Sequence, residues 1–324
     1  MEYINIKELS DFSFGNAEDT LDATGVTVII CKDGATAGVD VRGGGPATRE
    51  TDLLKSENMV QKIHAVTLSG GSAFGLEASS GVMEFLSERS IGFDMKGIYI
   101  PIVVGASLFD CGIANHKAYP DKRMGYEAAK NSLNNNIKMG NYGAGTGASV
   151  GKILGFNHSM KSGLGYSALK LNDLMVGAIV AVNACGDVFD ANSNIPLAGI
   201  YHSELKKRLY TEEIILNGDK VKTSPIENTT IACIITNADL SKAQANKLAS
   251  MAHDAYAHTI RPVHTTNDGD TIFTMCSNKV KAELDIVNIL AVKALEEAIV
   301  NGVKEADPAY GLLSYKSFPI TSHN

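Results

Sequence analysis

The apolar residues of this chain fall into two patterns, and each predicts a different kind of element. Short continuous runs rich in β-branched residues are typical of strands covered on both faces. Longer segments whose apolar residues return every three to four positions are typical of helices. The runs that predict strands or extended chain are 25–31, 36–41, 64–68, 99–105, 106–110, 176–182, 231–235 and 271–276. The segments that predict helices are 73–87, 127–134, 241–258 and 283–303.

Turn residues between these segments indicate how the first strands connect. Residues 32–34, Lys-Asp-Gly, are a turn signal and predict a hairpin in which 36–41 returns along 25–31. A glycine run follows at 43–45, close to two arginines. It is either a cradle for an anion or a loop that passes close under other backbone, and the sequence leaves both open.

One junction between polar and apolar chain carries candidate chemistry. A polar tract ends at Asn228, and the strand 231–235 begins directly after Thr229 and Thr230. A threonine hydroxyl is a poor nucleophile without a base, but an N-terminal threonine has its own α-amine as the base. A precursor could cut itself between Asn228 and Thr229 to create that terminus. The alternative is that both residues only form a turn and a strand entry.

Four other residues could take part in such chemistry. Asp268 and Asp270, with one glycine between them, could orient an ammonium or hydroxyl group, bind a cation, or form a turn. Asn183 follows the buried strand 176–182 and is either an oxyanion donor or a turn residue. Lys152 ends a glycine-rich loop and is either catalytic or a solvated surface lysine.

Two well-known motifs are approached but not matched. Ser72 follows a strand and precedes a helix, but Phe74 stands where the nucleophile elbow G-x-S-x-G needs glycine. Residues 145–152 resemble a phosphate-binding loop, but Thr146 and Ile153 break that pattern. Neither hydrolase-elbow nor nucleotide chemistry is therefore predicted.

Composition narrows the class of protein. A chain of 324 residues with 44% hydrophobic and 20% charged residues can bury a large core. The net charge of −7 argues against a nucleic-acid partner. The first residues lack a signal-peptide pattern, no apolar run is long enough for a membrane span, and the five cysteines are scattered and odd in number. We therefore expect a cytoplasmic protein without a membrane, disulfide or zinc framework.

Several longer motifs, in order along the chain, together resemble one family. They are residues 37–46, 48–52, 69–76, 228–230, 260–265 and 268–271. In these motifs the chain is similar to serine peptidase family S58, also called the P1 or DmpA family, which contains L-aminopeptidase/D-esterases, β-peptidyl aminopeptidases and nylon-oligomer (6-aminohexanoate oligomer) hydrolases. The Asn-Thr junction and the paired aspartates are closest to the nylon-oligomer branch, because aminopeptidase-type members cut before Ser and carry Ser and Glu at positions 268 and 270.

This resemblance implies a fold and a set of roles. The fold would be α/β, a four-layer αββα sandwich of the DmpA/ornithine acetyltransferase type, formed by one domain over 1–324. Self-cleavage would give an α-chain, 1–228, and a β-chain, 229–324, with Thr229 as the nucleophile. The roles of the other positions follow the family: the acidic pair falls on Asp268 and Asp270, the lysine on Lys152 and the oxyanion asparagine on Asn183. Phe109 is a candidate substrate-binding position that departs from the family, because many members have a tyrosine there and this chain lacks its phenolic donor for substrate placement or the oxyanion contact.

The resemblance also implies an activity. Thr229 would cleave amide bonds of small peptides or amide oligomers through an acyl-enzyme, without metal or organic cofactor, in a homo-oligomer of two-chain units, commonly a tetramer. The alternatives are an acyltransferase of the ornithine acetyltransferase type and an unprocessed, inactive homologue. Residues 188–225, the least apolar portion, are predicted to be surface and loop, with a solvated charge run at 206–208 and the linker that the cut would release.

Overall fold

The longest strand, β3 (Thr24–Val41), connects the two layers of one continuous ten-stranded sheet, and these layers are called the first and second sheet below. Its first part pairs with β2 (Ser13–Asp19) and β5 (Lys62–Ser69), and its last part pairs with β19 (Thr271–Val280). The predicted hairpin across residues 32–34 is therefore wrong, because the two parts of β3 continue in one strand and do not pair with each other. The turn signal marks a bulge instead: Gly34 has φ +75°, and the register against β5 shifts between Ile30 and Ala35.

The computed structural model describes residues 1–218 and 228–318. Its first sheet is antiparallel except for the pair β17–β19, which is parallel. The strands of this sheet, in spatial order, are β1 (Glu2–Tyr3), β11 (Leu164–Leu171), β12 (Leu174–Ala181), β17 (Ile231–Ala238), β19 and the last part of β3. Strand β17, which begins next to Thr229 and Thr230, is thus in the middle of its sheet.

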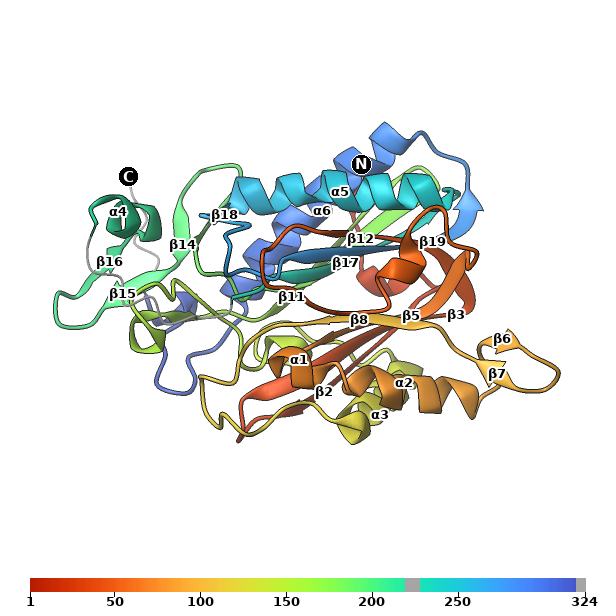
Figure 1. Cartoon of the computed structure of the whole chain (residues 1–324). Coiled ribbons are helices and arrows are strands. Elements are labelled where there is room, and N and C mark those ends of the chain that lie inside the picture. The colour runs from red at the N-terminus through yellow and green to blue at the C-terminus, as the bar shows by residue number, and fades with distance from the viewer. Residues whose placement is uncertain (219–227, 319–324) are drawn as a thin grey trace.

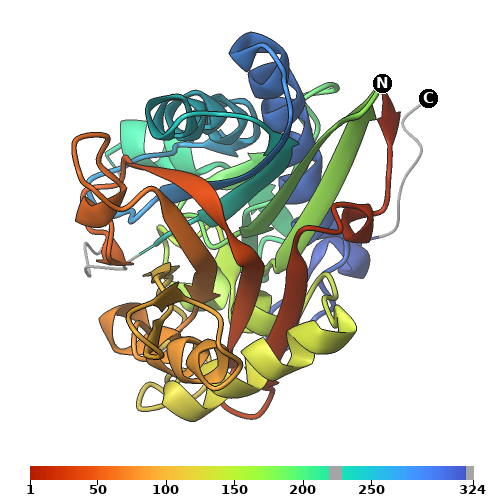
Figure 2. The same cartoon turned by 90° about the vertical axis from the view of Figure 1, so that its right-hand side faces the viewer.

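The second sheet is built on the first part of β3. It contains β2, β3, β5, β8 (Val103–Ser107) and β4 (Ala47–Arg49), with β5 and β8 parallel. Figures 1 and 2 show the two layers of strands stacked, with α5 (Lys242–Thr259) and α6 (Leu284–Lys304) outside one sheet. Helices α2 (Ala78–Ser87) and α3 (Lys122–Asn131) cover the other.

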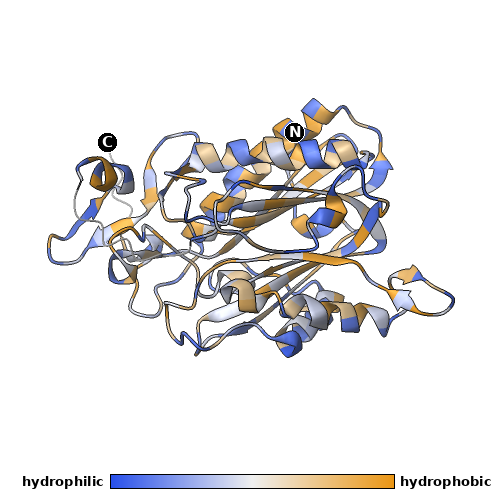
Figure 3. Ribbon diagram, viewed as in Figure 1, coloured by the Kyte–Doolittle hydropathy of each residue, from blue (hydrophilic) through white to orange (hydrophobic). Residues whose placement is uncertain are grey.

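Three separate apolar cores fill the spaces between these four layers. Strand β17 shows why both of its faces are apolar: Ile234 packs into the core under α5 and α6, and Ile235 packs between the two sheets. The third core lies under α2 and α3 and includes Phe85 and Val28. Figure 3 shows the hydrophobic residues concentrated on the strands and on the inward faces of the helices. The predicted four-layer αββα fold is confirmed.

Some predicted boundaries differ from the structure. The helix expected at 73–87 is two helices, α1 (Ser72–Gly75) and α2, and α3 begins before residue 127 because Asp121 caps it by accepting a hydrogen bond from the Met124 amide. Strand β11 was not predicted. None of the described helices is long and apolar enough to cross a membrane.

The portion 188–225, predicted to be surface and loop and to include the linker, is described as far as residue 218, and residues 219–225 lie outside the described residues. Its described part is not only surface and loop. Val188, Leu197 and Ile200 are buried, because short strands from this portion pack against the main body. The elements there are β13 (Asp187–Phe189), β14 (Pro196–Ala198), β15 (Ile200–His202), β16 (Lys207–Leu209) and α4 (Thr211–Leu216). The remaining short strands are β6 (Phe93–Asp94), β7 (Tyr99–Ile100), β9 (Ser149–Val150), β10 (Met160–Lys161) and β18 (Ile260–Arg261).

Candidate active site

The topology of the first sheet brings the candidate residues to one edge. Strands β17 and β19 are parallel and in register from Ile231 and Thr271, so the residues before them, 228–230 and 268–270, lie side by side. Strand β12 runs antiparallel to β17 and pairs Ala181 with Ile231, so Asn183 leaves the sheet at the same edge. Residues that are far apart in sequence are therefore neighbours in space.

Thr229 is buried, with only 4% of its surface exposed. Its backbone N–H donates to the carbonyl oxygen of Asn183 (3.1 Å), and its hydroxyl donates to the carbonyl oxygen of Asn228. The same Asn228 oxygen accepts the backbone N–H of Gly269 (2.9 Å). The hydroxyl of Thr229 and one main-chain donor therefore meet at the carbonyl group that precedes Thr229.

Residue 269, between the two aspartates, must be glycine because there is no space for a side chain. A Cβ added at Gly269 would lie 2.7 Å from Thr229 Oγ1 and 2.9 Å from the Gly45 carbonyl oxygen. Neither distance is compatible with an ordinary contact, so only glycine lets this loop approach Thr229 so closely. Sequence reasoning had no signal for this contact beyond the glycine itself.

Asp270 holds the backbone next to the candidate nucleophile. One carboxylate oxygen accepts the Thr230 backbone N–H (2.8 Å). The other accepts the backbone N–H (3.1 Å) and the ring Nδ1–H (2.8 Å) of His264. His264 lies within a motif that carried the family resemblance, but no role was predicted for it, because nothing in the sequence pairs it with Asp270.

Asp268 has a different environment. One of its carboxylate oxygens accepts the Thr265 backbone N–H (2.7 Å), and the other is buried without a hydrogen-bond partner among the described residues. Burial, and then the neighbouring charge of Asp270, raise the pKa of Asp268 to about 6. The two aspartates are thus buried members of the loop 265–270, called the acidic loop below, and do not form a solvated turn.

Lys152 is fully buried, so the solvated-surface interpretation is wrong for this residue. Its Nζ donates to the carbonyl oxygen (2.8 Å) and to the side-chain Oδ1 (2.7 Å) of Asn183. Burial lowers the pKa of Lys152 to about 7, against the attraction of Cys185, Asp268 and other acidic groups. Its backbone N–H also donates to the Cys185 carbonyl (3.1 Å), which places the glycine-rich loop along the chain after β12.

The orientation of the Asn183 amide is fixed by its partners. Its Oδ1 accepts both Lys152 Nζ and the Ser149 backbone N–H (3.1 Å), so the amide nitrogen must point the other way. That nitrogen donates to the carbonyl oxygen of Phe109 (3.0 Å). Phe109 therefore reaches the site through its main chain, and its half-buried ring stacks on Phe156 with centroids 6.4 Å apart.

The glycine run at 43–45 is a closely packed loop and not an anion cradle. The backbone N–H groups of Gly43, Gly44 and Gly45 donate to carbonyl oxygens of the acidic loop, those of residues 270, 265 and 268. A Cβ at Gly43 would lie 2.2 Å from the Asp268 carbonyl oxygen. The run therefore braces the acidic loop, and its N–H groups have protein partners.

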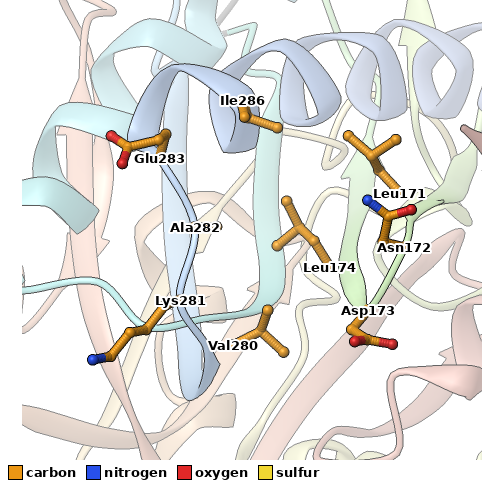
Figure 4. Close-up of a pocket in the computed structure, with 9 residues that line it drawn as sticks. All are labelled: Leu171, Asn172, Asp173, Leu174, Val280, Lys281, Ala282, Glu283 and Ile286. Atoms are coloured by element: carbon orange, nitrogen blue, oxygen red, sulfur yellow. The ribbon is translucent and has the colours of Figure 1, made fainter.

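A pocket of about 510 Å³ lies where β11 turns into β12 and where β19 ends, and Figure 4 shows the residues that line it. Leu171, Leu174, Val280 and Ile286 contribute its apolar lining. Strand β17 is 8 residues long, so its two ends lie roughly 20 Å apart. The pocket is at the end opposite Thr229 and is therefore not part of the cluster around Thr229. Within the described residues, no group of three or more His, Cys, Asp or Glu side chains is arranged to hold a metal ion.

The sequence of this chain is similar to known proteins of one peptidase family. The sequence profile of peptidase family S58 matches residues 10–315. An uncharacterised aminopeptidase of Mycobacterium leprae is 39% identical over 270 residues, which cover 80% of this chain and 72% of that protein. A 6-aminohexanoate-oligomer endohydrolase of Kocuria sp. is 30% identical over 271 residues, covering 83% of this chain and 73% of that protein.

Solved structures of similar fold agree with the four-layer architecture. The L-aminopeptidase D-Ala-esterase/amidase of Ochrobactrum anthropi superposes with a TM-score of 0.65 at 17% identity, covering 91% of this chain and 84% of that one. A β-aminopeptidase of Burkholderia sp. superposes with a TM-score of 0.65 at 18% identity, covering 94% and 88%. The first of these is described as a variant of the Ntn hydrolase fold.

Proposed function

Since this chain belongs to peptidase family S58 and is an amide-bond hydrolase, we propose that it cuts its own Asn228–Thr229 bond and then hydrolyses small amides through Thr229. The observation that carries this proposal is the meeting of the Thr229 hydroxyl and the Gly269 N–H at the Asn228 carbonyl group. A nucleophile and an oxyanion donor at one buried peptide bond are what a self-cleaving junction needs.

Self-cleavage proceeds in two balanced steps. Thr229 Oγ1 attacks the Asn228 carbonyl carbon, the C–N bond breaks, and the nitrogen takes a proton and becomes the α-amine of Thr229. Water then hydrolyses the resulting ester, which leaves the Asn228 carboxylate and a free threonine hydroxyl. The Gly269 N–H faces the oxygen on which negative charge develops in the first step.

Substrate hydrolysis would reuse the same hydroxyl with a new base. The α-amine, with a reference pKa of roughly 7.7–8, accepts the proton as Oγ1 attacks the substrate carbonyl. The Asn183 amide is held in one orientation by Lys152 and Ser149, and one of its two N–H groups donates to the Phe109 carbonyl oxygen. Its second N–H would donate to the oxyanion, a contact worth roughly 3–4 kcal/mol where such donors have been removed. Asp270 would hold the main chain at Thr230, and water would release the acyl group.

The two pieces would remain one molecule after the cut. Strand β17 pairs with β12 of the α-chain, β19 pairs with β3 of the α-chain, and α5 and α6 pack into the core beneath the first sheet. Buried area of this kind far outweighs the loss of one peptide link. We further propose a homo-oligomer of two-chain units, a tetramer in the simplest case, in a reducing cytoplasm, in keeping with five cysteines that are scattered along the sequence and odd in number.

We propose a substrate class from the names of the relatives. An aminopeptidase and a 6-aminohexanoate-oligomer endohydrolase both act on amide bonds, and we propose that this chain takes a small peptide or amide oligomer whose free amine is attracted by Asp268 and Asp270. A panel of amino-acid p-nitroanilides, β-peptides and 6-aminohexanoate oligomers, tested with purified protein, would identify the preferred amide. Thr229→Ala should be inactive on every member, and activity of that variant would exclude Thr229 as the nucleophile.

A further inference from the structure

His264 occupies a left-handed backbone conformation. Its φ is +56°, in a region that few residues other than glycine adopt, although asparagine, aspartate and histidine adopt it more often than the rest. In this conformation its backbone N–H and its ring Nδ1–H both point to the same Asp270 oxygen, at 3.1 and 2.8 Å. One residue therefore supplies two donors to one carboxylate oxygen, at the cost of backbone strain.

The His264 ring also contacts α5. It lies edge-on to His253 with centroids 4.7 Å apart, and its centroid is 5.9 Å from that of Tyr256. His253 is buried and anchored by its Nε2 to the Asp40 carbonyl oxygen (3.2 Å), and burial lowers its pKa to about 4. A neutral, fixed ring thus packs against the ring of His264.

The N–H and the carbonyl group of Thr230 are each hydrogen-bonded to a residue that His264 contacts. The Thr230 N–H is held by Asp270, the carboxylate that His264 orients. The Thr230 carbonyl oxygen accepts the hydroxyl of Tyr256 (3.2 Å), whose ring His264 contacts. Thr230 would be the second residue of the β-chain, so after the cut these two contacts hold the residue next to the new terminus.

We propose that His264 is a positioning residue that keeps Thr229 in place through Asp270 and Thr230. It acts on the nucleophile without touching it. Its contribution is greatest once the Asn228–Thr229 bond is broken, since the covalent hold on Thr229 from the α-chain is then lost. This inference rests on the proposed self-cleavage at Thr229.

Two amide substitutions separate positioning from general stability. Asn at 264 places its side-chain N–H close to the position of Nδ1 and tolerates a positive φ, whereas Gln carries its amide one methylene further out. His258→Ala is the matched control, because it removes another histidine–carboxylate pair, with Glu296, from an exposed part of α5. Each variant is assayed for processing on denaturing gels, for Tm, and for kcat and KM on the p-nitroanilide that the wild type cleaves best.

Positioning predicts that His264→Gln lowers kcat by roughly 10²-fold with KM nearly unchanged, because a small misplacement of a nucleophile has an effect of that size. His264→Asn should stay within about fivefold of wild type, and His258→Ala should equal wild type. Equal kcat for His264→Gln and wild type, or equal losses in the Asn and Gln variants, would overturn the inference. If the wild type itself is not cut before Thr229, the proposed function fails instead, and the gel distinguishes the two cases.

Discussion

The backbone N–H of Gly269 donates a 2.9 Å hydrogen bond to the carbonyl oxygen of Asn228. This oxygen belongs to the peptide bond whose cleavage would free Thr229, and the Thr229 hydroxyl donates to it as well. The short spacing of the two aspartates is thereby explained: the residue between them must be glycine to approach Thr229, and its N–H is aimed at the carbonyl to be attacked.

Gly269→Ala should slow self-processing by at least about 10²-fold, the effect of losing one oxyanion donor, because its Cβ would push the loop away from Thr229. The measurement is the fraction of uncut chain on denaturing gels over time. Gly45→Ala is the matched control in the neighbouring loop, since its Cβ would meet its nearest atom at 3.9 Å. Normal processing of Gly269→Ala, or equal slowing in both variants, would contradict the assigned role.

Replacement of each aspartate by asparagine should change the unfolding free energy by different amounts. In Asp268→Asn the new NH₂ can take the place of the oxygen that has no partner among the described residues, so unfolding free energy should change by less than about 1 kcal/mol. In Asp270→Asn the NH₂ must face either Thr230 N–H or His264, so the loss should be about 2–4 kcal/mol.

Urea unfolding in a Thr229→Ala background, where the chain is uncut, measures this difference. Both amide variants in the otherwise wild-type chain should also lower turnover by at least about 10²-fold. Equal stability of the two variants would show that Asp270 is not held by these three donors. Wild-type turnover in both would remove the acidic pair from the mechanism.

The burial of Lys152 predicts how the unfolding free energy depends on pH. The pKa of Lys152 is about 7 in the folded chain, against an ordinary lysine pKa of 10.5, so between those values the unfolded chain binds more protons and stability rises with pH. Relative to Lys152→Met, the Lys152 protein should gain up to about 1.4 kcal/mol of unfolding free energy per pH unit.

Urea unfolding of both proteins at about pH 7.5 and about pH 9, again in the Thr229→Ala background, tests the sign and the window. Comparing two chains that differ only at residue 152 cancels the contributions of the buried thiols, whose pKa values are raised by burial. A difference between the two proteins that is flat or falls over this range would mean that Lys152 stays charged in the fold.

The sequence predicted the family and the four-layer fold, and both are confirmed. The apolar runs carried much of this, because strands such as β17 are buried on both faces and so leave a continuous apolar pattern. The predicted hairpin at 32–34 was wrong because a glycine with positive φ occurs in bulges as well as in turns. Only the strands that pair with β3 distinguish the two, and these are not visible in the local sequence.

The residues of the site were predicted by resemblance, and the structure brings Thr229, Asn183, Lys152, Asp268 and Asp270 together, while their roles stay predictions. Local pattern could not supply the rest. His264 and Gly269 matter through contacts with Asp270 and Asn228 that depend on the register of β17 against β19. Burial of Lys152 likewise follows from packing against the chain after β12, which a glycine-rich sequence does not reveal.

N-terminal sequencing of the purified protein, with intact-mass measurement, tests the central claim most directly. The claim predicts two chains, one beginning at Met1 and one beginning Thr-Thr-Ile-Ala-Cys at Thr229, whose masses sum to that of the full chain plus one water. Thr229→Ala should give a single chain of 34.4 kDa, and Thr229→Ser should still be cut. A wild-type protein that remains a single chain, or a Thr229→Ala protein that still yields the fragment beginning at residue 229, would contradict self-cleavage by Thr229.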